Sequence, residues 1–425
     1  MQSLRGLEIL DSRGLPTVKA YCVLRSGAQG AATVPSGAST GSAEAVELRD
    51  GDPTRFGGLG CRKAVHSIDA VIAPALVGRP FVSQSEWDAA LVAADGTPDK
   101  SRLGANALLG CSLAFARARA ADLGRPLFEY LAEMAGATPR LPRLMVNLFS
   151  GGKHAGGQVA IQDVMVIPLA AASIDASLAI VSAIYREAAM TVQRKYGQRP
   201  LVADEGGLAP DFGTSDEMLA AAGEAVAGAG LALGTDVALA VDVAAGHFHH
   251  ADRYELDGRS LTGAEMIDVL SSWVDRFGLV SVEDGLADDD WPHWMALRSR
   301  LEGRAITLGD DLLCTNPGRV ARAVELHAAT ALLLKPNQVG TLTEAREALL
   351  RARDAGWVVV ISARSGETED DWLADLAVGW AGDYMKVGSI ARSERLAKYN
   401  RLLEIEDLGE LPLAPSRLVE VTADA

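Results

Sequence analysis

Six ionisable residues stand where short apolar runs of the sequence end, and their types suit metal-assisted acid–base chemistry. Carboxylates at neighbouring strand ends suit Mg²⁺, because this hard cation takes oxygen ligands and keeps part of its water. A lysine that follows an apolar run such as residues 332–334 is partly removed from water, and burial with nearby cations lowers its pKa towards that of a usable base. The six residues are Glu205, Asp242, Glu283, Asp310, Lys335 and Lys386.

A plainer interpretation stays open for each of these residues. Taken singly, an acid of this kind is more often a salt-bridge partner, and the two lysines could simply neutralise the carboxylates. The shared position of Asp242, Glu283 and Asp310 at successive strand ends favours the metal site over the plainer interpretation.

Strand-like runs recur through the second part of the chain, and helical stretches such as 173–196, 215–229, 319–327 and 343–355 separate most of them. Eight or nine strands alternating with helices over about 280 residues predict an α/β fold, a (β/α)8 TIM barrel. The carboxyl ends of such strands meet at one mouth, where their polar residues face a single ligand. The expected strands cover 144–148, 164–167, 201–203, 237–241, 279–282, 306–308, 331–334, 358–361 and 384–385.

The first part of the chain predicts a smaller α+β domain. Residues 7–34 contain three strand-like runs, and helical periodicity follows over 63–77, 84–94 and 106–124. The Pro-containing break at 137–143 predicts a domain boundary, which gives an N-terminal domain at 1–136 and a barrel domain at 137–425. The small residues of loop 35–41 let backbone approach a ligand, although a simple hairpin connection explains them too.

Composition excludes several classes of protein. The net charge of −16 argues against a nucleic-acid surface, since binding phosphates needs clustered Lys and Arg. The four scattered cysteines form no Cys-x-x-Cys pair, which indicates a reduced, cytoplasmic chain. The first residues lack a long apolar core and no run of about 18 apolar residues occurs, so neither secretion nor a membrane partner is expected.

Several long motifs resemble the enolase family. They begin at Asp11-Ser-Arg-Gly and include residues 34–41, 47–52, 204–210, 281–284, 309–312, 335–342, 364–370 and 391–400. The similarity runs from about residue 7 to 406, and other barrels of the wider superfamily lack the motifs at 36–40 and 364–368. The resemblance implies an enolase-type (β/α)8 TIM barrel with an N-terminal α+β capping domain, and a homodimer.

The resemblance also implies the roles of the site residues. Two Mg²⁺ ions would bind per site, with a small phosphorylated or phosphonylated carboxylate as substrate. Lys335 would remove the proton alpha to the carboxylate, Glu205 would assist departure of the 3-hydroxyl, and His154 lies on a glycine-rich loop that would close over the site. The implied set is catalytic Lys335, Glu205, His154 and Asp163; substrate-binding Lys386, Arg364, Ser365, Gln162 and Ser39; and the metal ligands Asp242, Glu283, Asp310 and Ser39.

The chain departs from the family pattern on the side of the leaving group. Ala363 stands where enolases carry a histidine, and losing general-acid help typically costs about 10²–10⁴-fold in rate. Asp163 replaces a glutamate, which withdraws the carboxylate by about 1.5 Å. Ser150 replaces an asparagine, and residues 387–390 also differ from the family sequence.

Three functions stay open on these residues. The smaller Ala363 and Asp163 favour an altered substrate, and the chain is similar in this respect to the carboxyphosphonoenolpyruvate synthases of phosphinothricin biosynthesis. The first alternative is a housekeeping enolase that converts 2-phosphoglycerate to phosphoenolpyruvate. The second is a non-catalytic protein with the enolase fold, although the presence of all the metal ligands and both lysines argues against it.

Overall fold

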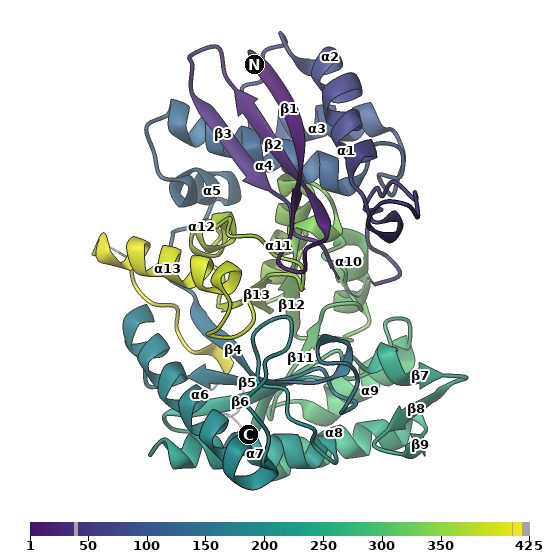
Figure 1. Ribbon diagram of the computed structural model, residues 1–425, viewed down its shortest axis with the longest axis vertical. Helices are drawn as coiled ribbons and strands as arrows, with labels where there is room; N and C mark the ends of the chain where they lie inside the picture. The colour runs from purple at the N-terminus through teal and green to yellow at the C-terminus, as the bar shows by residue number, and fades with distance from the viewer. Residues whose placement is uncertain (38–40, 410, 419–425) are drawn as a thin grey trace.

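The computed structural model describes residues 1–37, 41–409 and 411–418. An antiparallel sheet opens the chain, formed by β1 (Ser3–Leu10), β2 (Pro16–Val23) and β3 (Gln29–Thr33). Helix α4 (Ala105–Asp122) packs across β2 and β3. It comes so close that a Cβ atom on Gly30 would lie 2.2 Å from the carbonyl oxygen of Ala114. These elements form the upper part of the molecule in Figure 1.

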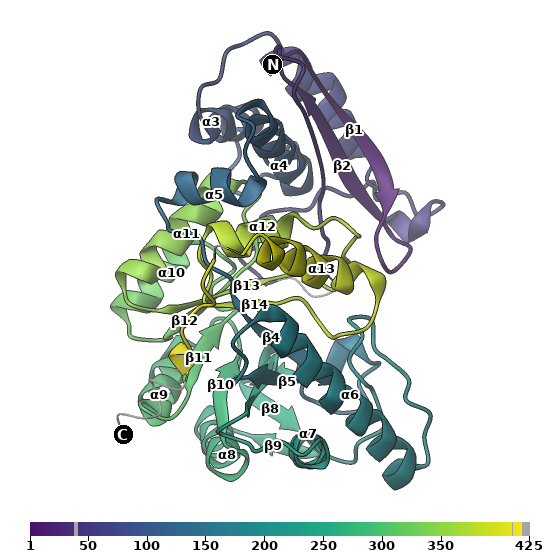
Figure 2. The same cartoon turned by 90° about the vertical axis from the view of Figure 1, so that its left-hand side faces the viewer.

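Shorter helices complete this first unit. Helix α1 (Arg62–His66), η2 (Ser67–Ile72) and α2 (Ala73–Leu76) run on from one another, and α3 (Gln84–Asp95) begins at Ser83, whose side chain accepts a hydrogen bond from the amide of Glu86. Helix α5 (Leu127–Ala135) packs against α12 (Trp372–Gly379), beside the barrel (Figure 2). The expected strands and helices before residue 136 are therefore confirmed.

Among the described residues, eight strands close into a barrel. The barrel order is β10-β11-β12-β13-β14-β4-β5-β6. The bounds are β4 (Arg143–Ser150), β5 (Asp163–Pro168), β6 (Val237–Asp242), β10 (Leu279–Glu283), β11 (Ile306–Gly309), β12 (Ala331–Leu334), β13 (Val358–Ser362) and β14 (Tyr384–Lys386).

The barrel departs from strict strand–helix alternation at its beginning. Strand β5 pairs antiparallel with both β4 and β6, whereas the remaining strand pairs of the barrel are parallel. No α-helix lies between β4 and β5, so the chain turns back through loop 151–162 instead of crossing over. The expected strand at 201–203 is wrong: Val202 forms only an isolated bridge with Leu208, in the long connection from β5 to β6.

Helices cover the outside of the barrel. Several begin at a hydroxyl residue that accepts a hydrogen bond from the first turn, as Thr262 does in a full capping box with Glu265. A small sheet of β7 (His249–His250), β8 (Arg253–Leu256) and β9 (Arg259–Leu261) lies at one side (Figure 1). The helices are α6 (Ile174–Tyr196), α7 (Ser215–Gly228), α8 (Gly263–Phe277), α9 (Trp291–Leu301), α10 (Pro317–Glu325), α11 (Leu342–Asp354), α12 and α13 (Ser393–Asp407).

The N-terminal unit is joined to the barrel by buried polar contacts. Asp88 of α3 accepts hydrogen bonds from the amide (2.9 Å) and the hydroxyl (2.6 Å) of Thr343, at the start of α11. Lys100 pairs with Glu344 one residue further on. Within the ranges that the structure describes, no helix combines the length and the apolar character that crossing a membrane requires.

Candidate active site

The mouth of the barrel collects the residues that the sequence placed at strand ends. Asp242, Glu283 and Lys386 are the last residues of β6, β10 and β14, while Asp310 and Lys335 directly follow β11 and β12. Asp242, Glu283, Asp310 and Lys386 are buried, and Lys335 is partly buried. A cavity there is lined by His154, Gln162, Glu205, Asp242, Asp310, Lys335, Ser362, Ala363, Arg364, Ser365, Lys386 and Gly388.

Lys386 lies between two of the carboxylates. Its Nζ donates to Asp242 Oδ2 at 2.9 Å and to both oxygens of Glu283 at 2.7 and 2.8 Å. Burial raises the pKa of Glu283 well above its usual value, and the charge of Asp242 adds to this rise. Burial also acts to raise the pKa of Asp242, but Lys386 outweighs it and brings that pKa to about 2.

Lys335 is paired with the third carboxylate. Its Nζ donates to Asp310 Oδ2 at 2.5 Å, and Gln338 donates to the other oxygen of Asp310 at 2.9 Å. Burial lowers the pKa of Lys335, but the adjacent Asp310 outweighs burial, so the pKa lies above its ordinary value. The expectation of a lowered pKa is therefore wrong, because the folded protein gives the lysine a carboxylate partner.

The donor set at the mouth fits a divalent cation. Three buried carboxylates, those of Asp242, Glu283 and Asp310, contact the ammonium groups of Lys335 and Lys386. Buried like charges of this kind need a compensating positive charge. Carboxylate oxygens are the ligands that Mg²⁺ prefers. Ser39, the remaining expected metal ligand, lies outside the described residues.

Asp284 is a residue of the site that the sequence analysis missed. Its buried carboxylate accepts hydrogen bonds from the backbone amides of Asp310 (3.0 Å) and Asp311 (2.8 Å). It thereby fixes the loop that carries Asp310, and the side chains of these three aspartates offer oxygens within 4.8 Å of one another. In the sequence, the adjacent acids Glu283-Asp284 and Asp310-Asp311 were the signal that could have indicated Asp284 as a site residue.

Arg364 lines the same cavity and is held by an acid from the N-terminal unit. Its guanidinium nitrogens donate to Glu44 at 3.0 and 3.1 Å. Both side chains are buried. Ser365 is close by, and its hydroxyl accepts a hydrogen bond from Arg13 at 3.3 Å. Sequence reasoning missed Glu44, whose only signal was a position just after the small-residue loop.

The expected leaving-group residues His154, Asp163 and Glu205 lie close to one another. The Nδ1 atom of His154 lies 3.5 Å from Asp163 Oδ2 and 4.0 Å from Glu205 Oε2. Asn147 donates to Glu205 at 3.1 Å. Glu205 reaches the site from a turn and not from a strand end, which corrects the sequence-based placement.

Asp163 reaches the mouth because β5 runs antiparallel. As the first residue of β5 it stands beside Asp242, the last residue of β6. Ser150, at the end of β4, donates to Asp163 Oδ1 at 2.6 Å. Gln162 donates to Asp242 Oδ2 at 3.1 Å, so the expected substrate-binding amide also faces the carboxylates. Burial raises the pKa of Asp163 to about 7.

Comparison with known proteins decides the family. Residues 1–131 match the family described as "Enolase, N-terminal domain" and residues 138–413 the one described as "Enolase, C-terminal TIM barrel domain". The chain belongs to the enolase family. It is 44% identical over 414 residues to a protein named Enolase 1 from Methylococcus capsulatus, across 96% of this chain and 98% of that protein. The enolase-type fold, barrel and capping sheet are thus established.

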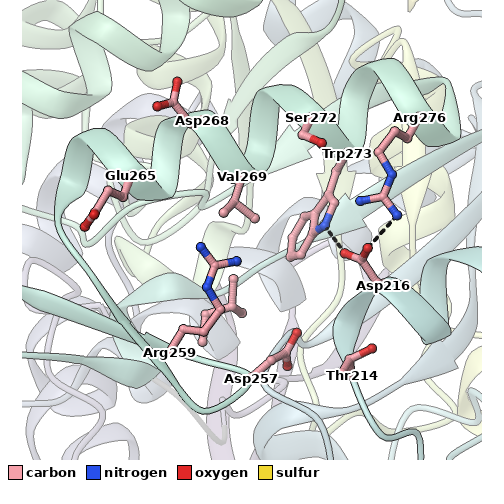
Figure 3. Close-up of a pocket in the computed structure, with 11 residues that line it drawn as sticks. Thr214, Asp216, Asp257, Arg259, Glu265, Asp268, Val269, Ser272, Trp273 and Arg276 are labelled. Carbon is pink, nitrogen blue, oxygen red and sulfur yellow. Dashed lines mark hydrogen bonds and ion pairs between the residues drawn. The ribbon is translucent and has the colours of Figure 1, made fainter.

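A second groove of this enolase-family protein lies on the outside of the barrel, between α7, α8 and the β8–β9 hairpin (Figure 3). Its central acid, Asp216, accepts a hydrogen bond from the indole of Trp273 at 2.6 Å and pairs with Arg276 at 2.5 Å. The residues lining this groove differ from those lining the strand-end cavity. The strand-end cavity gathers Asp242, Asp310, Lys335 and Lys386 at the barrel mouth, so it is the better candidate for the active site.

Proposed function

We propose that the protein is a Mg²⁺-dependent enolase that converts 2-phosphoglycerate to phosphoenolpyruvate. The reaction removes the proton alpha to the carboxylate, and the 3-hydroxyl leaves as water, so the step needs a base on one side and a proton source on the other. The observation that carries this proposal is the placement of Lys335 and Lys386 among three buried carboxylates at strand ends. The similarity to Enolase 1 supports the same reaction.

Asp242, Glu283, Asp310 and Ser39 are the proposed ligands of two Mg²⁺ ions. When bound, the ions neutralise the negative charge that proton removal adds to the substrate carboxylate. Lys335 donates to Asp310 at 2.5 Å, so the proposed base and one proposed metal ligand are in contact. A metal held by Asp310 would compensate that carboxylate and would so weaken the interaction that favours the ammonium form of the lysine.

Lys335 is the proposed base and takes the alpha proton at Nζ. The substrate carboxylate binds near Lys386 and Gln162, and the phosphate binds Arg364 and Ser365. Because Arg364 already pairs with Glu44, the guanidinium is held in place before substrate arrives. A positioned cation of this kind loses little freedom on binding an anion.

Glu205, His154 and Asp163 are proposed to act on the leaving hydroxyl. A proton passed to the 3-oxygen from this group lets it depart as water while the new double bond forms. Asp163 suits this role, since burial raises its pKa to about 7 and so keeps a proton available near neutral pH. Ser150 and Asn147 hold two of these carboxylates in position.

The organisation of the chain completes the proposal. We further propose a capping domain at 1–136 and a barrel domain at 137–425, divided at the Pro-containing break, together with a cytoplasmic location and the homodimer that the resemblance to enolases implies. The four cysteines are free and buried, which agrees with a reduced compartment.

Ala363 supports a second candidate function. Its buried methyl group lines the cavity without offering a polar atom from its side chain. This second function is that of a carboxyphosphonoenolpyruvate synthase, whose substrate is a 2-phosphoglycerate derivative carrying an added phosphonoformate group. The similarity to Enolase 1 places this function second.

One assay tests the principal proposal. The purified protein is mixed with 2-phosphoglycerate and Mg²⁺, and phosphoenolpyruvate is followed by its absorbance. We expect rapid formation that chelation of the metal abolishes. Absence of product with 2-phosphoglycerate alone would contradict the proposal and would direct attention to nucleotide-activated phosphonoformate as a second substrate.

A further inference from the structure

We propose that a cavity at the junction of the N-terminal unit and the barrel binds a small phosphate monoester that carries an apolar or aromatic group. The cavity has a volume of about 400 Å³, and its walls come from α3, α4, α5 and α11 (Figure 2). Small-molecule sites typically enclose about 300–1,000 Å³. The inference rests on the lining residues Val82, Arg119, Leu123, Arg125, Met134 and Arg346. None of them lines the strand-end cavity, so the inference stands independently of the reaction proposed above.

The charges around this cavity select an anion. Three arginines line it, and Glu133 is the only acid among the described residues that do so. A guanidinium keeps its charge at any pH that the protein meets, and its planar donors match the oxygens of a phosphate group. In a chain whose net charge is −16, this grouping of arginines differs from the rest of the molecule.

Arg346, in the second turn of α11, lacks a partner for its charge. Within the described ranges it forms no ion pair, and its buried Nε atom has no hydrogen-bond partner. Buried donors are nearly always paired, because an unpaired donor has lost its hydrogen bonds to water without replacement. An anion in the cavity supplies both the missing acceptor and the missing negative charge.

The two other arginines keep donors that a phosphate can use. Arg119 of α4 gives Nη1 to Asp122 at 2.8 Å, but its Nε atom is also buried and has no partner among the described residues. Arg125 pairs with Glu133 at 2.7 Å, and these two side chains are 48% and 69% exposed. Water screens an ion pair of this kind, so a doubly charged phosphate competes for the guanidinium.

Apolar side chains form another part of the lining. Val82 is 75% exposed, Leu123 is 44% exposed, and Met134 is half-buried. Inorganic phosphate would leave these side chains in water, whereas a ligand with an apolar portion removes them from it, which is favourable. The lining therefore fits a compound that joins a phosphate group to an apolar or aromatic group.

Phenyl phosphate is the probe for this inference, since it has both parts. Its binding to the full-length protein is measured by isothermal titration calorimetry without Mg²⁺. We expect Arg346→Gln and Arg119→Gln each to weaken binding about tenfold, as removal of one charge-assisted hydrogen bond does. Leu123→Ser should weaken binding of phenyl phosphate several-fold and leave the affinity for inorganic phosphate unchanged.

Two control variants locate the binding. Arg351→Gln changes another arginine of α11, one that pairs with Glu347 at 2.7 Å and does not line the cavity. Arg364→Gln changes the arginine of the strand-end cavity. Both controls should keep the wild-type affinity for phenyl phosphate, and circular dichroism establishes that each variant is folded.

Three results would overturn the inference. The first is a wild-type protein that does not bind phenyl phosphate. The second is binding that Arg364→Gln abolishes and that Arg346→Gln and Arg119→Gln leave intact, because the probe then occupies the strand-end cavity. The third is equal affinity for phenyl phosphate and inorganic phosphate, which would remove the apolar part of the ligand. The assay of 2-phosphoglycerate turnover is independent of all three results.

Discussion

Lys386 donates to both carboxylate oxygens of Glu283, at 2.7 and 2.8 Å, across the mouth of the barrel. The two residues end β14 and β10, which are not neighbours in the barrel order. The same ammonium reaches Asp242 at 2.9 Å. One lysine therefore holds two buried acids that are both proposed metal ligands.

Replacing Lys386 should lower the free energy of unfolding, and added Mg²⁺ should reverse this loss. Breaking a buried ion pair by deleting one partner typically costs about 3–5 kcal/mol, so Lys386→Met should lower the free energy of unfolding by this order without metal. Added Mg²⁺ should raise the stability of the variant more than that of the wild type. Urea unfolding with and without Mg²⁺ measures both values, and an equal Mg²⁺ effect on the two proteins would contradict the account.

The Ser150 hydroxyl should affect the reaction rate through its hydrogen bond to Asp163. Loss of their 2.6 Å hydrogen bond frees the carboxylate to move, and a displacement of about 1 Å can cost about 10²-fold in rate. Ser150→Ala should therefore lower kcat by about 10- to 100-fold with little change in KM. In a double variant with Asp163→Asn the two losses should not add, and steady-state kinetics that show additive losses would exclude this coupling.

Ala363→His tests the space on the leaving-group side. A histidine there should raise turnover of 2-phosphoglycerate, because it adds a proton donor or a positive charge near the departing hydroxyl. It should also block any substrate with an added group. Relative kcat/KM for the two substrates provides the readout, and unchanged selectivity would count against the second candidate function.

Asp88 lies at the contact between the N-terminal unit and the barrel. Its raised pKa predicts that the free energy of unfolding of the protein depends on pH. Burial raises its pKa from 3.8 to about 6, even though Thr343, Ser112 and Gln84 oppose this rise. A carboxyl whose pKa is raised on folding favours the folded state at low pH, and that contribution is lost as pH rises from about 4 to 6. Asp88→Asn, which stays neutral, should lack this loss.

The comparison is made by urea unfolding of both proteins from pH 4 to 7. Relative to Asp88→Asn, the wild type should lose on the order of 3 kcal/mol across this range, since one pKa unit corresponds to about 1.36 kcal/mol. A constant difference between the two proteins at all pH values would show that the carboxyl ionises equally easily in the folded and unfolded states.

Short apolar runs that end at a charged residue predicted most of the barrel strands. The length of such a run and the position of its end are local properties of the sequence. Lys335, Asp310 and Glu283 were located in this way. The antiparallel course of β5 was not predictable, since an apolar run carries no direction. This reversal brings Asp163 to the mouth from the start of its strand.

Other features depend on contacts between distant segments. Glu44 reaches Arg364 from the N-terminal unit, and no local pattern indicates such a pairing. The raised pKa of Lys335 has the same origin, because Asp310 is 25 residues away in the sequence and adjacent only in the folded protein. The resemblance to enolases supplied the role of Glu205, because the short apolar run before it predicted a strand end and the residue lies in a turn.

The most direct measurement follows the alpha proton of 2-phosphoglycerate in deuterated water with Mg²⁺, by nuclear magnetic resonance, for the wild type and for Lys335→Ala. The account predicts deuterium incorporation and phosphoenolpyruvate formation by the wild type, and loss of both in the variant. A folded Lys335→Ala protein that still exchanges the proton at the wild-type rate would contradict the assignment of Lys335 as the base.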